Sequence, residues 1–168
     1  MSVTQQLARV RAELPEGVTL VAVSKTHPAE LIREAYDAGQ RIFGESRPQE
    51  LREKYELLPK DIEWHMIGHL QTNKVKYIAP FVQLIHSVDS ARLAEAIQAQ
   101  AARCGRVIDI LPEIHVAREE TKAGGDPAQL GDYLAANPVE PLPYVPVPGP
   151  MGIATCCGHA ACVRTVLG

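Results

Sequence analysis

A single lysine follows the first apolar run of the chain. Residues 18–24 are mostly apolar and predict a short strand that is buried on both faces, and Lys25 comes directly after it. Pro28 suits the first turn of a helix, which the pattern predicts over residues 29–38. An amine at the carboxyl end of a buried strand can lose its proton near neutral pH and condense with an aldehyde. The alternative is a solvated lysine at the start of a loop.

Two histidines lie at the end of another predicted strand, over residues 62–67. Strand alternation puts Trp64 and Met66 on one face and His65 on the other, and His69 follows in the turn. A metal site needs two or three converging ligands, and the strand pattern does not bring these two histidines together. We therefore predict structural histidines and no metal site.

Polar side chains follow two further predicted strands. Ser46 comes after the strand predicted over residues 41–44, and Asp89 comes after the one predicted over residues 81–86. One interpretation is that they line a common pocket with Lys25. The other is capping of the following helices, by Ser46 in one case and by Asp89 or Ser90 in the other. The sequence leaves both interpretations open.

Three other groups of residues have weaker chemical patterns. Residues 71–74 open a predicted helix, whose free N–H groups together with Lys74 could hold an anion. Lys122 belongs to a polar loop or offers a second amine near the pocket. The metal-ligand types near the C-terminus match no zinc spacing: Cys156, Cys157, His159 and Cys162.

Predicted strands alternate with helices about every 20 to 25 residues, which is typical of parallel βα units. A doubly wound sheet and a (β/α)8 TIM barrel share this pattern, but no glycine-rich phosphate turn follows the first strand, which favours the barrel. The other predicted strand covers residues 107–116, with a sixth before residue 151. Helices are predicted over residues 3–14, 49–58, 72–79, 90–104 and about 126–136. A complete barrel needs roughly 200 residues or more, so we expect about six of its eight units in this chain.

Composition excludes several classes of protein. The chain has 168 residues, 46% of them hydrophobic, enough for a sizeable core. Its formal net charge of -3 offers no basic face for nucleic acid. No apolar run approaches the roughly 20 residues of a membrane helix, and the first residues lack the apolar core of a signal peptide, so we expect a cytoplasmic protein.

Six motifs taken together are more specific than any one of them. In chain order they are VAVSKTHP, FGESRPQE, WHMIGHLQTNK, HSVD, EETKAG and MGIAT. Over residues 1–155 they resemble the YggS/PROSC family of pyridoxal 5'-phosphate (PLP) homeostasis proteins. The resemblance implies the fold of the alanine racemase N-terminal barrel. It also implies PLP held as a Schiff base on Lys25, and a role in intracellular PLP homeostasis without established catalysis.

The resemblance also implies further cofactor-binding residues, but no catalytic residue. Ser46 stands where the family has an asparagine, and Lys122 matches a lysine that could be a secondary amine for PLP. The other residues carried over for cofactor binding are His69, Asn73, Met151 and Thr155.

The chain departs from the family after the sixth motif. Two phosphate-binding motifs, expected after strands seven and eight, have no counterpart, and prolines crowd residues 138–150. We therefore expect a truncated or frameshifted C-terminus, with a partial barrel domain at residues 1–155 and an atypical tail at residues 156–168. The family implies a monomer, whereas an open barrel would favour self-association.

The expected partners are PLP and the PLP-dependent apoenzymes that could receive it. Two alternatives to a PLP carrier remain: a racemase-like enzyme that acts on an amino acid with PLP, and a nonfunctional truncated product. The racemase would need a second acid or base opposite Lys25.

Overall fold

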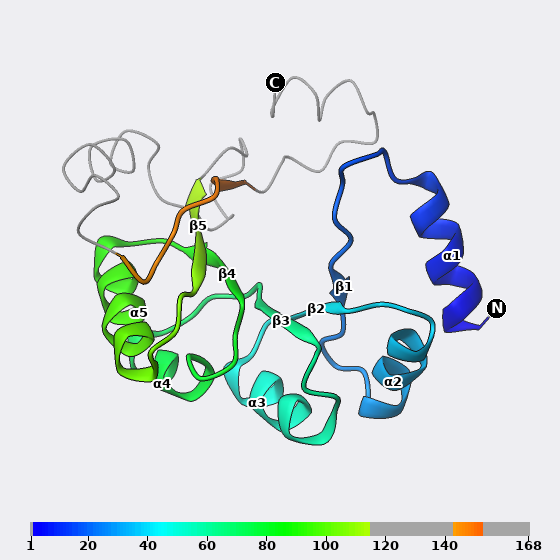
Figure 1. Ribbon diagram of the computed structural model, residues 1–168, viewed down its shortest axis with the longest axis horizontal. Helices are drawn as coiled ribbons and strands as arrows, with labels where there is room; N and C mark the ends of the chain where they lie inside the picture. The colour runs from blue at the N-terminus through cyan, green and yellow to red at the C-terminus, as the bar shows by residue number, and fades with distance from the viewer. Residues whose placement is uncertain (1, 115–142, 153–168) are drawn as a thin grey trace.

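The computed structural model describes residues 2–114 and 143–152, and its strands form one parallel sheet (Figure 1). The six described strands are hydrogen-bonded in the order β1-β2-β3-β4-β5-β6. This is the order of a barrel, because a doubly wound sheet would have its first strand in the interior. The strands are β1 (Ala22–Val23), β2 (Ile42–Glu45), β3 (Glu63–Met66), β4 (Leu84–Val88), β5 (Asp109–Ile114) and β6 (Met151–Gly152). The prediction of an incomplete (β/α)8 barrel is confirmed.

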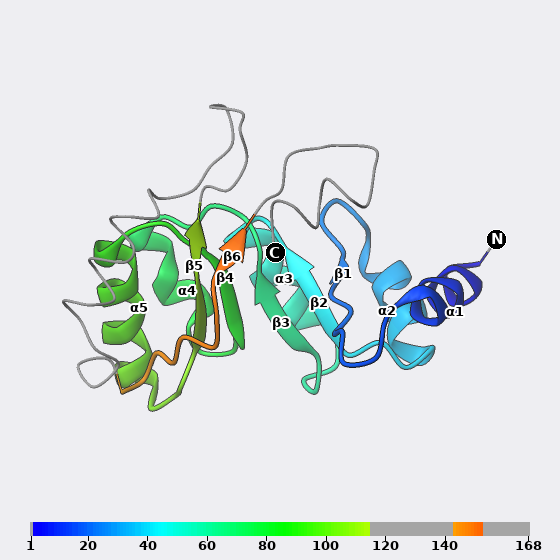
Figure 2. The same cartoon turned by 90° about the horizontal axis from the view of Figure 1, so that it is seen from above.

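The helices lie around the outside of the curved sheet, as Figures 1 and 2 show. They are α1 (Val3–Glu13), α2 (Ala29–Asp37), α3 (Pro48–Leu57), the 3-10 turn η1 (Thr72–Lys74), α4 (Val75–Ile78) and α5 (Ala91–Cys104). The core fills the space between these helices and one face of the sheet, where Trp64 and Met66 are fully buried. The alternation predicted for β3 is therefore confirmed.

Local signals set the ends of two helices. Ser2 and Gln5 form a capping box at the start of α1, each accepting a hydrogen bond from the other's backbone N–H. Ser90 caps α5 by accepting from the backbone N–H of Leu93 at 3.4 Å, and Gly105 ends it in the left-handed region at φ 61°. Both ends of α5 agree with the predicted helix at residues 90–104.

The burial predicted for residues 18–24 is wrong. Only Ala22 and Val23 form β1, and the side chains of Val18 and Val23 are 53% and 51% exposed. The reason is position, because β1 is an edge strand that pairs only with β2 within the described residues. An apolar run is buried on both faces only where a sheet has neighbours and layers on every side.

Two boundaries also differ between prediction and structure. The strand predicted over residues 81–86 begins later, because the N–H groups of Phe81 and Val82 still donate to the carbonyl of Ile78. The helix predicted over residues 72–79 is a 3-10 turn followed by the short α4, too short for the proposed anion site at its N-terminus. The helix predicted near residues 126–136 lies outside the described residues.

Within the described part of the chain, no helix is long and apolar enough to span a membrane. The same residues hold no cluster of three side chains of the metal-ligating types.

Candidate functional site

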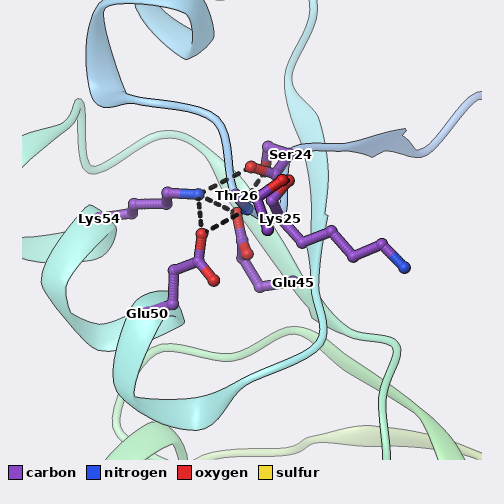
Figure 3. A network of polar contacts seen from close by, with 6 residues as sticks. All are labelled: Ser24, Lys25, Thr26, Glu45, Glu50 and Lys54. Carbon is purple, nitrogen blue, oxygen red and sulfur yellow. Dashed lines mark hydrogen bonds and ion pairs between the residues drawn. The ribbon is translucent and has the colours of Figure 1, made fainter.

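Lys25 lies just beyond the carboxyl end of β1, and its side chain is exposed. Figure 3 shows the Lys25 side chain extending away from the charged residues nearby. Its amine makes no hydrogen bond or ion pair with residues 2–114 or 143–152. Thr26 follows with φ 66°, an unusual conformation for a residue that is not glycine. The amine is therefore accessible, but it lies on a constrained segment of backbone.

A buried cluster of charged side chains lies behind this segment. The ammonium group of Lys54, on α3, donates to the main-chain oxygen of Ser24 and to carboxylate oxygens of Glu45 and Glu50, each at 2.7 Å. The hydroxyl of Ser24 donates to the same oxygen of Glu45 at 2.6 Å. Glu45 is completely buried and Lys54 is 6% exposed, so the contact between these two forms away from water, whereas the Glu50 side chain is partly exposed (Figure 3).

Glu50 connects the cluster to the residue after Lys25. Its Oε1 accepts a hydrogen bond from the backbone N–H of Thr26 at 2.7 Å. The hydrogen bond from Lys54 holds the pKa of Glu50 below its usual range, against the opposing effect of burial. The carboxylate therefore stays charged, which strengthens its bonds to Lys54 and to Thr26.

A close backbone contact joins the ends of β2 and β3. A Cβ placed on Gly68 would lie 2.4 Å from the main-chain oxygen of Ser46 and 2.8 Å from its Cα, so only glycine fits there. The hydroxyl of Ser87, at β4, donates to the Gly68 oxygen. Ser46 does not cap α3, whose N-cap is Arg47 without a side-chain hydrogen bond, so the capping interpretation of Ser46 is wrong.

Farther along the same edge, His69 pairs with Asp89 at 3.3 Å from Nδ1 to Oδ2. Of the two predicted capping candidates for α5, Ser90 is the cap and Asp89 is not. Burial, with the nearby charge of Asp89, raises the pKa of Glu113 on β5. Glu113 in turn is the register partner of Met151 on β6.

The predicted site residues thus fall into three groups. Lys25, Ser46 and His69 follow β1, β2 and β3, and Met151 lies on β6 of the same parallel sheet, whose strands have their carboxyl ends at one edge. Asn73 and Lys74 belong to η1 and are exposed. Thr155, Lys122 and the cysteines of the C-terminal tail lie outside the described residues.

The buried lysine of α3 was missed by the sequence interpretation, although a signal for it exists. Leu51, Lys54 and Leu58 recur at the spacing of one helix face, and the structure buries all three. A lysine at a core position requires a buried acceptor, and Glu45 at the end of the preceding strand was available. Glu50, four residues before Lys54, also has the ordinary spacing of a helical ion pair.

The six-strand order and the lysine at the end of β1 agree with one known family. The model of the alanine racemase N-terminal domain matches residues 2–156. The chain belongs to this family.

Two curated relatives from different bacteria carry the same name. The chain is 49% identical to the pyridoxal phosphate homeostasis protein of Aquifex aeolicus, over 80% of this chain and 58% of that protein. It is 40% identical to the protein of the same name from Escherichia coli K12, over 83% of this chain and 60% of that one. The predicted resemblance to the PLP homeostasis proteins is confirmed. The chain spans less than two thirds of the length of both relatives.

Solved structures have the same fold as this chain. PipY of Synechococcus elongatus without PLP superposes with a TM-score of 0.89 at 40% identity, covering 98% of this chain and 77% of PipY. PipY with PLP bound gives a TM-score of 0.84. Alanine racemase of Streptomyces lavendulae, at 21% identity and a TM-score of 0.76, shares the fold over 44% of its own chain.

Proposed function

We propose that this chain binds PLP through a Schiff base on Lys25 and takes part in intracellular PLP homeostasis. The observation that carries the proposal is an exposed amine on a constrained segment at the carboxyl edge of a parallel sheet. Membership of the family, together with a 40% identical relative solved with PLP bound, supports it. We assign this binding to residues 1–155, with residues 156–168 as an atypical tail, and we propose a cytoplasmic location.

The residues fit the aldehyde end of PLP. The Nζ of Lys25 is accessible and has no competing carboxylate among the described residues. PLP supplies an aldehyde carbon. With PLP bound, the uncharged amine of Lys25 would condense with this carbon, with the loss of one water. Ser46, His69, Asn73, Met151 and Thr155 are proposed to contact the rest of the cofactor.

Chemical trapping tests this proposal. PLP is added to the purified protein, a visible absorbance band is sought, and borohydride then reduces the Schiff base. We expect one adduct, heavier than the protein by PLP less one oxygen atom, and peptide mapping should find it on Lys25. Lys25→Ala should lose both band and adduct, whereas Lys76→Ala, which removes an exposed lysine on α4, should keep both. An adduct that persists in Lys25→Ala contradicts the proposal.

The homeostasis role adds two finer proposals. PLP held on Lys25 is passed to PLP-dependent apoenzymes, which predicts activation of such an apoenzyme by the loaded protein. The unpaired side of β1 within the described sheet, with exposed Val18 and Val23, supports self-association, which sedimentation at several concentrations would detect.

The alternative of a racemase-like enzyme predicts PLP-dependent loss of chirality from an amino acid, and a nonfunctional product predicts no adduct at all.

A further inference from the structure

The lysine proposed to carry PLP is held by very little of the sheet. β1 has two residues paired with β2, followed by one more hydrogen bond from the Ser24 N–H to the Gly44 oxygen at 3.0 Å. Contacts with α3 hold the backbone beyond that point. Lys54 binds the carbonyl of Ser24, immediately before Lys25, and Glu50 binds the N–H of Thr26, immediately after it.

These contacts fix the two peptide units that flank Lys25. Lys54 and Glu50 are also bonded to each other at 2.7 Å, so the two ends of the segment are joined through one ion pair. Glu45 anchors the ammonium group from the sheet side, and the hydroxyl of Ser24 adds a further bond to Glu45. The left-handed φ of Thr26 is unfavourable by itself and needs such support.

We propose that Lys54, acting through Glu45 and Glu50, is a positioning residue for Schiff-base formation at Lys25. This inference rests on the proposed function. The ion cluster lies on the helix side of the sheet, and the Lys25 side chain extends away from it (Figure 3). The cluster therefore need not touch PLP. It fixes the position and direction from which the Lys25 side chain leaves the backbone, and this reduces the entropy lost when the amine reaches the aldehyde.

The first experiment measures, without PLP, how far the cluster holds the backbone next to Lys25. In Glu50→Ala the Lys54–Glu45 pair remains, but the N–H of Thr26 loses its acceptor. We expect hydrogen exchange at the Thr26 amide to become at least about tenfold faster, while amides of the core strands stay as in wild type. Glu53→Ala is the matched control, because Glu53 is an exposed residue of the same helix and accepts a hydrogen bond from the side chain of Gln49 rather than from Thr26. Unchanged Thr26 exchange in Glu50→Ala overturns the inference.

The second experiment separates positioning from general loss of structure. Lys54→Met/Glu45→Gln removes the buried ammonium and the charge it neutralises, so no unpaired ion is left in the core. For this variant and for Glu50→Ala we expect the covalent step with PLP to slow by about tenfold or more. Binding of pyridoxine 5'-phosphate, which has no aldehyde, should stay within about twofold of wild type. If the rate of the covalent step and the affinity for pyridoxine 5'-phosphate fall together, or if neither changes, Lys54 is a structural residue and the inference fails.

The two proposals fail in different ways. Absence of any adduct on Lys25 in the wild-type protein contradicts the proposed function, and with it the positioning role. An adduct that forms on Lys25 at the wild-type rate in both variants leaves the proposed function intact and overturns only the positioning role. If the double variant does not fold, Glu50→Ala still decides, because its substituted side chain lies at the partly exposed edge of the cluster.

Discussion

The Nε2 atom of His86 lies 3.0 Å from Nδ1 of His65, on the neighbouring strands β4 and β3. Burial lowers the pKa of both rings, and the nearby His86 lowers that of His65 further, to about 4. The two rings therefore share one hydrogen bond as neutral groups, with a proton on one of the facing nitrogens. They are structural histidines, as the sequence predicts for His65.

This pair predicts a loss of stability in mild acid. His65 titrates near pH 6.5 in the unfolded chain but near 4 in the folded one, so between these values only the unfolded state takes up the proton. The contribution of neutral His65 to the free energy of unfolding is fully present above pH 6.5 and is lost as the pH falls toward 4. We expect the free energy of unfolding to drop by about 2 kcal/mol between pH 8 and pH 5 from His65 alone. Urea unfolding at the two pH values measures it.

His65→Gln supplies the comparison for this measurement, because glutamine can keep a hydrogen bond but does not titrate. The variant should lose less stability on acidification than wild type, by about the same 2 kcal/mol. His27→Gln, at an exposed histidine, should behave as wild type. An equal acid loss in wild type and His65→Gln would show that another group is responsible.

Glu113 predicts the opposite pH dependence. Its pKa is raised in the folded protein, so its contribution is most favourable at low pH and is lost as the pH rises through the folded pKa. Glu113→Gln should therefore stabilise the protein at pH 7 more than at pH 4. Thermal unfolding of the variant and of wild type at both pH values tests this. A variant that is less stable than wild type at pH 7 would contradict the prediction.

The buried ion pair predicts a non-additive double substitution. Lys54→Met leaves the fully buried Glu45 without its cation, which should cost about 3 to 5 kcal/mol of unfolding free energy. Adding Glu45→Gln removes the unpaired charge and should recover much of that loss. Denaturant unfolding of wild type, both single variants and the double variant measures the coupling. If the double variant loses the sum of the two single losses, the pair is not coupled.

The contact between Gly68 and Ser46 predicts strict intolerance of a side chain. In Gly68→Ala the new methyl group meets backbone at 2.4 Å, so the ends of β2 and β3 must separate. We expect a loss of about 2 kcal/mol or more and weaker PLP binding. Gly149→Ala is the control, since nothing lies within 4 Å of its Cβ position. Similar stabilities for the two variants would contradict the contact.

The order of strands and helices could be predicted from the sequence because each signal is local. Apolar periodicity in α5, its cap at Ser90 and the alternation around Trp64 depend only on residues close in the chain. The motifs then identified the family. Burial could not be predicted in this way, because it depends on contacts between elements that are far apart in the sequence.

Two residues illustrate this limit. Val23 belongs to an apolar run and yet is half exposed, because β1 lies at the edge of the described sheet. Lys54 is charged and yet buried, because Glu45, nine residues earlier, lies at the end of β2, where the ammonium group of α3 reaches it. In both cases tertiary neighbours overrule the preference of the residue itself.

The shortness of β1 determines how the molecule opens. With only two residues in the ladder and an exposed apolar surface, β1 is expected to detach in a local unfolding event that leaves the rest of the sheet intact. The bonds to α3 begin one residue later, at Ser24. Fluctuations of the edge therefore end where the helix contacts begin, and Lys25 moves with α3 rather than with its own strand.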